Sequence, residues 1–190
     1  MDPTPESETL ARLRADLQAY AARWPDEAAT VGHFIALLDE LPSSPFHRER
    51  LEGHFTGSAW LVDRSGERVL LTHHRKLGRW LQLGGHADGD VDLANVALKE
   101  AEEESGLRDL TLQPGVFDLD RHWIPARGDV PAHWHYDVRF VVRAGRDEAF
   151  VVSDESLALA WRDVRELRAD PASDESVQRM SRKWLADAPR

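Results

Sequence analysis

Apolar residues recur every three or four positions near the start of the chain, which is the period of an amphipathic helix. In the first predicted helix they are Leu10, Leu13, Leu17, Tyr20 and Trp24. A second helix is predicted from Asp26 to Leu41, and the prolines of the segment 42–45 end it. We expect the two helices to form a hairpin, and we assign residues 1–50 to an N-terminal helical extension.

The pattern changes to short β-rich runs from residue 54 onward. Strands are predicted over residues 55–62, 69–72, 110–120 and 133–142, with a further short strand region between 151 and 161 and a final helix over 174–185. In the run 133–142, apolar and polar side chains alternate, so one face of that strand is predicted to be apolar and the other polar. With an acidic helix between the strands, this order indicates an α+β fold, an α/β/α sandwich on a mixed sheet, for residues 51–190.

The composition of the chain narrows the classes of function. Its 190 residues carry a formal net charge of −10, which argues against general binding to nucleic acid or to an anionic membrane surface. The chain contains no cysteine, which excludes disulfides, thiolate metal sites and cysteine nucleophiles. No stretch approaches the ~18 apolar residues of a membrane span, and the N-terminus lacks the pattern of a signal peptide. We therefore expect a cytoplasmic protein that binds neither membrane nor nucleic acid.

Three glutamates stand one turn apart in the acidic helix. They are Glu100, Glu103 and Glu104. Like charges at this spacing repel each other unless water or a bound cation separates them. Gly84 and Gly85 are expected to let the backbone approach a ligand closely, and Gly106 to end the helix in a left-handed conformation. The apolar face predicted to dock on the sheet consists of Ala94, Leu98 and Ala101.

The segment from Gly85 to Leu107 resembles the Nudix box, which is a glycine, five residues, Glu, seven residues, Arg-Glu, an apolar residue, any residue, Glu-Glu, any residue, a glycine and an apolar residue. The positions that match in register are Gly85, Glu100, Ala101, Glu103, Glu104, Gly106 and Leu107. Two positions differ, because Val91 stands at the first glutamate and Lys99 at the arginine. In the family this pair braces the loop and the helix, so its loss affects the brace more than the metal ligands. The wider segment 54–161 is also similar to a Nudix domain.

The resemblance implies a Nudix-type hydrolase acting on acid anhydrides, which cleaves a diphosphate (pyrophosphate) linkage in a nucleotide or a related small phosphorylated compound. Carboxylate oxygens suit Mg²⁺ or Mn²⁺, and these ions neutralise phosphate charge and lower the pKa of a bound water. By resemblance, Glu103 and Glu104 are the principal metal ligands, and Glu100 is a ligand or assists the water. The resemblance also implies that the Gly85 carbonyl completes the coordination, and it places Glu155 where some family members have an additional catalytic carboxylate. The alternative for the three glutamates is a solvated acidic helix face.

Imidazole and basic side chains lie on both sides of the box. The candidate substrate-binding residues are His73, His74, Arg75, Arg79, His86, His133 and His135. They could line the cleft and bind phosphate. In a sharper variant, His133 and His135 share one strand face and join Asp137 or His86 around Zn²⁺. Otherwise, the segment 73–76 caps a hairpin in solvent and the later histidines form ordinary hydrogen bonds in the sheet.

Two further classes fit the same fold. A catalytically weak or inactive ligand-sensing or regulatory module is favoured by the changes at Val91 and Lys99. An isomerase of the isopentenyl diphosphate type relies, in the family, on a cysteine, which this chain lacks. The N-terminal helices could bind a partner or form a homodimer.

Overall fold

The computed structural model describes residues 4–40, 44–75, 77–152 and 156–187. The chain divides into two compact units. Residues 1–57, 85–96 and 115–139 form the first, and residues 58–84, 97–114 and 140–190 form the second. Strands β1 (His54–Val62) and β7 (His133–Arg143) and helix α3 (Leu93–Ser105) contribute residues to both units.

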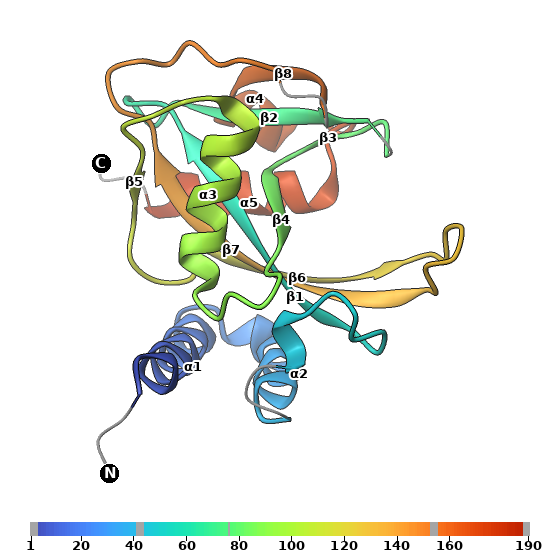
Figure 1. The fold of residues 1–190 in the computed structure, drawn as a ribbon. Coiled ribbons are helices and arrows are strands. Elements are labelled where there is room, and N and C mark those ends of the chain that lie inside the picture. Colours follow the sequence, from blue (N-terminus) through green and yellow to red (C-terminus); the bar gives the residue numbers. More distant parts are fainter. Residues whose placement is uncertain (1–3, 41–43, 76, 153–155, 188–190) are drawn as a thin grey trace. The chain divides into compact units, whose positions relative to one another are not determined.

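The first unit contains the N-terminal helices and a two-stranded ribbon (Figure 1). Its helical segments are α1 (Pro5–Arg23), the 3-10 turn η1 (Pro25–Glu27), α2 (Ala28–Leu38) and the 3-10 turn η2 (Ser44–Phe46). The Thr4 hydroxyl caps α1 by accepting a 3.2 Å hydrogen bond from the Ser7 amide, and Pro25 begins the turn that separates the helices. The predicted helix pair is thus confirmed. The ribbon consists of β6 (Asp118–Ile124), antiparallel to the first part of β7.

Helix α2 contributes an aromatic side chain to the core of the first unit. The ring centroid of the fully buried Phe34 lies 6.2 Å from that of Phe55 in β1 and 5.3 Å from that of Tyr136 in β7. The ring of Phe46 lies 5.0 Å from the same Phe55 ring. The N-terminal segment therefore shares one aromatic cluster with the two strands, and this burial rather than helix propensity holds it in place.

The second unit contains most of the remaining strands and the C-terminal helices. These elements are β2 (Arg68–His74), β3 (Trp80–Leu81), part of β4 (Leu83–His86), β5 (Thr111–Leu112), β8 (Ser156–Asp163), α4 (Val164–Ala169) and α5 (Glu175–Asp187). The strand order is β3-β2-β1-β7-β5, and β4 pairs with β1, β6 with β7 and β8 with β2. This arrangement confirms the predicted α+β class and mixed sheet. Within the described ranges, no helix has both the length and the apolar character required to cross a membrane.

Three features of the fold differ from the sequence-based expectation. The continuous strand predicted over 110–120 is divided into β5 and β6. Gly115 lies between them with a φ of +85°, which is incompatible with extended strand backbone. Helix α4 and strands β3 and β4 are too short for a periodic pattern to reveal them. Val151 and Val152, expected in a strand region, lie exposed before β8.

Both faces of β7 are buried near its middle. Val138 and Phe140 on the apolar face are 0% and 3% exposed, and Asp137 and Arg139 on the polar face are each 2% exposed. The predicted alternation is present. The polar face can be buried because its charged side chains form ion pairs, chiefly between Arg139 and neighbouring aspartates.

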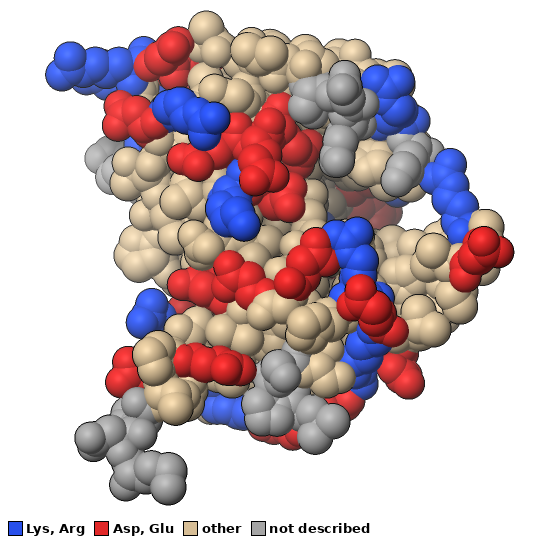
Figure 2. Space-filling view, viewed as in Figure 1, with Lys and Arg blue, Asp and Glu red and all other residues tan. Residues whose placement is uncertain are grey.

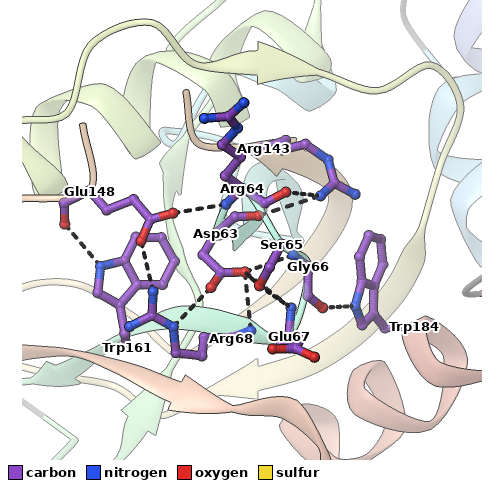
Figure 3. Close-up of polar contacts among 10 residues, drawn as sticks. All are labelled: Asp63, Arg64, Ser65, Gly66, Glu67, Arg68, Arg143, Glu148, Trp161 and Trp184. Atoms are coloured by element: carbon purple, nitrogen blue, oxygen red, sulfur yellow. Dashed lines mark hydrogen bonds and ion pairs between the residues drawn. The ribbon is translucent and has the colours of Figure 1, made fainter. Parts of the chain in front are cut away.

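The turn between β1 and β2 is organised around one carboxylate (Figure 3). Asp63 Oδ1 accepts hydrogen bonds from the Ser65 hydroxyl at 2.9 Å and from the Gly66 amide at 2.7 Å, while Asp63 Oδ2 accepts from Arg68 Nε at 2.8 Å. Burial alone would raise the pKa of Asp63, but the hydrogen bonds from Arg68, Ser65 and the turn amides outweigh it and lower the pKa. The ionised carboxylate therefore fixes the hairpin.

Candidate functional site

The acidic helix α3 begins after two capping aspartates and ends before Gly106. At its start, Asp92 Oδ1 accepts from the Asn95 amide at 3.1 Å, and Asp90 Oδ1 accepts from the Asp92 amide at 2.9 Å. At its end, Gly106 has a φ of +71° and donates to the carbonyl of Glu102 at 2.9 Å. The predicted left-handed termination at Gly106 is confirmed.

The packed face of α3 differs from the predicted one. Ala101 is buried as expected, but Ala94 and Leu98 are only half-buried. The other buried apolar side chains of the helix are Leu93, Val96 and Ala97. The packed face is therefore turned around the helix axis toward Leu93, Val96 and Ala97. This rotation brings one of the three glutamates, Glu104, onto the buried side.

Glu104 is held by a backbone amide. Glu104 is 9% exposed. Its Oε1 accepts a 2.8 Å hydrogen bond from the amide of Gly84, the second residue of β4. The amide fixes the orientation of the buried carboxylate. Gly84 was expected to let the backbone approach a ligand, but its close approach is to the protein: a Cβ at this position would lie 2.2 Å from Ser58 Oγ and 2.7 Å from Ser58 Cα.

The other predicted ligands lie closer to solvent. Glu103 is exposed and Glu100 is half-buried, and acidic side chains gather over the C-terminal part of α3 in the view of Figure 2. Gly85 is half-buried in β4. Glu155, the predicted additional carboxylate, lies outside the described residues. The helix therefore presents one fixed, one half-buried and one exposed carboxylate.

The loop that leads into α3 is tied to the N-terminal segment. The amide of Gly89 donates to the carbonyl of Phe46 at 2.9 Å, and Arg48 forms a two-pronged ion pair with Asp88, its Nε 2.6 Å from Oδ1. Gly89 has a φ of +91°, and a Cβ there would lie 2.8 Å from a ring carbon of His47. These contacts hold the loop in a chain that has Val91 where the Nudix box has its first glutamate.

Four histidines of the first unit form a cluster. His86 ends β4, His133 and His135 lie on β7, and His54 begins β1. The ring of His54 lies 4.8–5.3 Å, centroid to centroid, from the other three rings. Three of these residues were predicted from sequence. His54 was not predicted, because its membership of the cluster depends on where β1 lies in the fold.

Burial favours the neutral form of three of these imidazoles, those of His54, His86 and His135. It lowers the pKa of His54, and together with the Arg48 guanidinium and the His54 ring it lowers the pKa of His86 to about 4. Burial and the neighbouring His86 and His54 rings lower the pKa of His135 to about 2. These three rings therefore offer lone pairs rather than positive charge near neutral pH.

Arg139 is enclosed by three carboxylates beside this cluster on β6 and β7. Its Nε lies 2.7 Å from Asp137, its Nη1 3.0 Å from Asp118 and its Nη2 3.1 Å from Asp120. Burial opposes the charge of Arg139, but the carboxylates outweigh it and raise the pKa of the guanidinium. Asp137 also accepts from the Thr56 hydroxyl at 2.9 Å. With Asp137 engaged in these contacts, His86 is the better of the two partners suggested for a zinc site.

The remaining predicted substrate-binding residues belong to the second unit. His73 and His74 end β2, and the His73 ring stacks on Trp80 at 5.2 Å. Arg75 Nη2 donates to the Ser156 carbonyl at 3.2 Å, and Arg79 Nη1 forms a 2.7 Å ion pair with Asp174. Both guanidinium groups thus have protein partners in this structure.

Comparison with known proteins identifies the fold. The family model of the NUDIX domain matches residues 54–184. A hydrolase of the NUDIX family from Clostridium perfringens is 21% identical over 70% of this chain and 96% of its own, with a TM-score of 0.51. A C. elegans Ap4A hydrolase, in a binary complex, is 17% identical over 70% of this chain and 95% of its own, with a TM-score of 0.55. The E. coli dihydroneopterin triphosphate pyrophosphohydrolase is 17% identical over 70% of this chain and 96% of its own, with a TM-score of 0.53. No curated protein matches the chain.

Proposed function

Because this chain belongs to the NUDIX domain family, we propose that it is a divalent-metal-dependent hydrolase that cleaves a diphosphate linkage in a nucleotide or a related small phosphorylated compound. The expectation of a Nudix-type hydrolase agrees with the family and with its structural neighbours. The observation that carries the proposal is the buried Glu104, oriented by the Gly84 amide on the helix that also bears Glu100 and Glu103.

The donor set fits Mg²⁺ or Mn²⁺. Glu103 and Glu104 supply hard carboxylate oxygens one residue apart, and Glu100 supplies another one turn earlier. Bound Mg²⁺ or Mn²⁺ would neutralise phosphate charge and lower the pKa of a bound water. The Gly85 carbonyl stays a predicted further ligand, and Glu155 a predicted base.

The protein would contribute to the reaction by orienting the carboxylates of Glu104, Glu103 and Glu100. Glu104 cannot rotate freely because the Gly84 amide holds one of its oxygens, whereas the exposed Glu103 can adjust to an incoming substrate. In the proposed reaction a water oxygen attacks one phosphorus, the bond from that phosphorus to the bridging oxygen breaks, and two phosphate-bearing fragments leave together with a proton. Glu100, half-buried on the same helix, is the proposed acceptor of that proton or a third metal ligand.

Two structural neighbours support the proposed substrate class. One is named as a hydrolase of Ap4A and the other as a pyrophosphohydrolase of dihydroneopterin triphosphate. Since these relatives share the fold at 17% identity, we take from them the class of small phosphorylated compounds and no single substrate. A cytoplasmic location and a homodimer formed through the N-terminal helices stay predictions.

A substrate panel tests the proposal. Purified protein with Mg²⁺ or Mn²⁺ should release products from at least one nucleotide or related compound that contains a diphosphate linkage, as followed by chromatography. Glu103→Gln and Glu104→Gln should lower kcat by roughly 100-fold or more. Glu102→Gln is the matched control, because Glu102 lies on the same helix and faces Arg108 at 3.9 Å. Absence of turnover on the whole panel, or equal activity of all three variants, would contradict the proposal.

A second candidate is a ligand-sensing module, favoured by Val91 and Lys99 at the positions of the family's bracing pair. Calorimetry separates the two. A sensor would bind a nucleotide without turnover, and the affinity would survive Glu103→Gln.

A further inference from the structure

The histidine cluster of the first unit has the arrangement of a metal site. The metal-binding atoms of His54, His133 and His135 all lie within 4.8 Å of one another. His54 and His133 are 1% and 6% exposed, and His135 is half-buried. Each imidazole has two ring nitrogens that need a hydrogen-bond or metal partner when buried, so three buried rings at this spacing require such partners.

Backbone carbonyls set the orientation of two rings. His54 Nδ1 lies 3.1 Å from the Arg50 carbonyl, and His133 Nδ1 lies 2.8 Å from the Pro131 carbonyl. A carbonyl can only accept, so each Nδ1 must carry the hydrogen and each Nε2 must present its lone pair. This is the outer-shell bond that metal-ligating histidines make with their second nitrogen.

The lone pair of His54 is unsatisfied. Its Nε2 is buried and has no hydrogen-bond partner among the residues that the structure describes. A buried acceptor of this kind has lost its hydrogen bonds to water and destabilises the fold unless something binds it. The His133 and His135 Nε2 atoms lie 3.1 Å apart. Two ligands at about 2.0–2.1 Å from a tetrahedral zinc ion lie about 3.3 Å from each other.

We propose that His54, His133 and His135 bind Zn²⁺ through their Nε2 atoms, with His86 or a water in the fourth position. The His86 ring lies 5.1 Å from that of His135 and 5.3 Å from that of His54. Neutral imidazole is the form that binds metal, and a ligand set without carboxylate selects Zn²⁺ over Mg²⁺ and Mn²⁺. The site shares no residue with the proposed glutamate site and does not rest on the proposed hydrolase activity.

Neighbouring groups support the site. Asp120 Oδ2 lies 3.1 Å from His122 Nδ1, and the His122 ring lies 5.4 Å from that of His135. The same carboxylate is bound by Arg139, which also engages Asp118 and Asp137. This network braces β7, the strand that carries His133 and His135, against β6.

Cobalt is the probe for the test. Chelator-treated protein is titrated with Co²⁺ in excess Mg²⁺, which keeps the glutamates occupied. We expect the intense visible absorption of four-coordinate Co²⁺ to saturate at about one equivalent and to vanish on addition of Zn²⁺. His133→Gln and His135→Gln should each weaken Zn²⁺ binding by about 100-fold or more. His33→Ala, an exposed histidine on α2, is the matched control, and Glu103→Gln should leave the cobalt spectrum unchanged.

X-ray absorption at the zinc edge of the wild-type protein gives an answer that does not depend on variants. Nitrogen ligands at about 2.0–2.1 Å with imidazole scattering are expected. Octahedral cobalt, an oxygen-only zinc shell, or Zn²⁺ affinity unchanged by His133→Gln in a folded variant would overturn the proposal. Loss of the cobalt spectrum in Glu103→Gln would assign the metal to the glutamates instead.

Discussion

The backbone amide of Gly84 and the carboxylate of Glu104 form a 2.8 Å hydrogen bond between residues twenty positions apart. The bond turns a buried acidic side chain, which would otherwise cost folding free energy, into an oriented group. The strand must also carry glycine here, since Ser58 leaves no room for a Cβ.

Gly84→Ala should therefore destabilise the protein. The new methyl group would lie 2.2 Å from Ser58 Oγ and 2.7 Å from Ser58 Cα, so the strand has to shift, at a cost of about 1–3 kcal/mol. Urea denaturation measures the change in unfolding free energy. Gly32→Ala is the control, because Gly32 lies in α2 and nothing stands within 4 Å of the place that its new methyl group would take. This change should be neutral or stabilising. Equal effects of the two substitutions would rule out the steric explanation.

Arg139→Met should be among the most damaging single changes in the first unit. It would leave Asp118 and Asp137, both almost fully buried, without their cation. Removing one partner of a buried ion pair costs about 3–5 kcal/mol. Thermal and urea unfolding measure the loss, with the exposed Arg64→Met as control. A loss below that of the control would mean that water or counter-ions replace the guanidinium.

Asp63→Asn should reveal a pH-dependent contribution to stability. The folded-state pKa of Asp63 is lowered from its ordinary value of 3.8, so its ionised form stabilises the folded protein above that pH. The difference in unfolding free energy between wild type and Asp63→Asn should be constant near neutral pH. It should shrink as the pH falls through 3.8 and below. Urea titrations at several pH values test this, and a difference that grows toward acid would contradict it.

Arg48→Ala should change the titration of Asp88 more than global stability. The two side chains are about half exposed, so their ion pair contributes no more than about 1 kcal/mol. The hydrogen bond and charge of Arg48 are, however, the main reason that the pKa of Asp88 is lowered. NMR titration should show that pKa rising toward 3.8 in Arg48→Ala, and less so in Arg48→Lys, which keeps the charge. An unchanged Asp88 titration would show that another group lowers its pKa.

Local patterns predicted what local forces determine. The helix pair, the left-handed Gly106 and the strand that begins at His133 follow from spacing of apolar residues and from glycine chemistry, and the structure confirms them. The Nudix resemblance rested on fixed offsets within one segment, and the family match confirms it.

Contacts between distant segments could not be predicted in the same way. The role of His54 depends on the placement of β1 beside residues about eighty positions later, and no periodic signal encodes that pairing. The burial of the polar face of β7 depends on Arg139 meeting three aspartates from two strands. The packed face of α3 was predicted as Ala94, Leu98 and Ala101, whereas Leu93, Val96 and Ala97 are buried beside Ala101, because the surrounding fold decides which side of the helix is covered.

The hydrogen bond from Gly89 to the Phe46 carbonyl limits how far the chain can be truncated from its N-terminus. The family match starts at residue 54, and a truncation at that boundary would remove the Phe46 carbonyl, Arg48 and the Phe34 ring together. The loop ahead of α3 would lose both of its anchors and β1 would lose an aromatic neighbour. A fragment that keeps these contacts would therefore have to begin before Phe34, well upstream of residue 54.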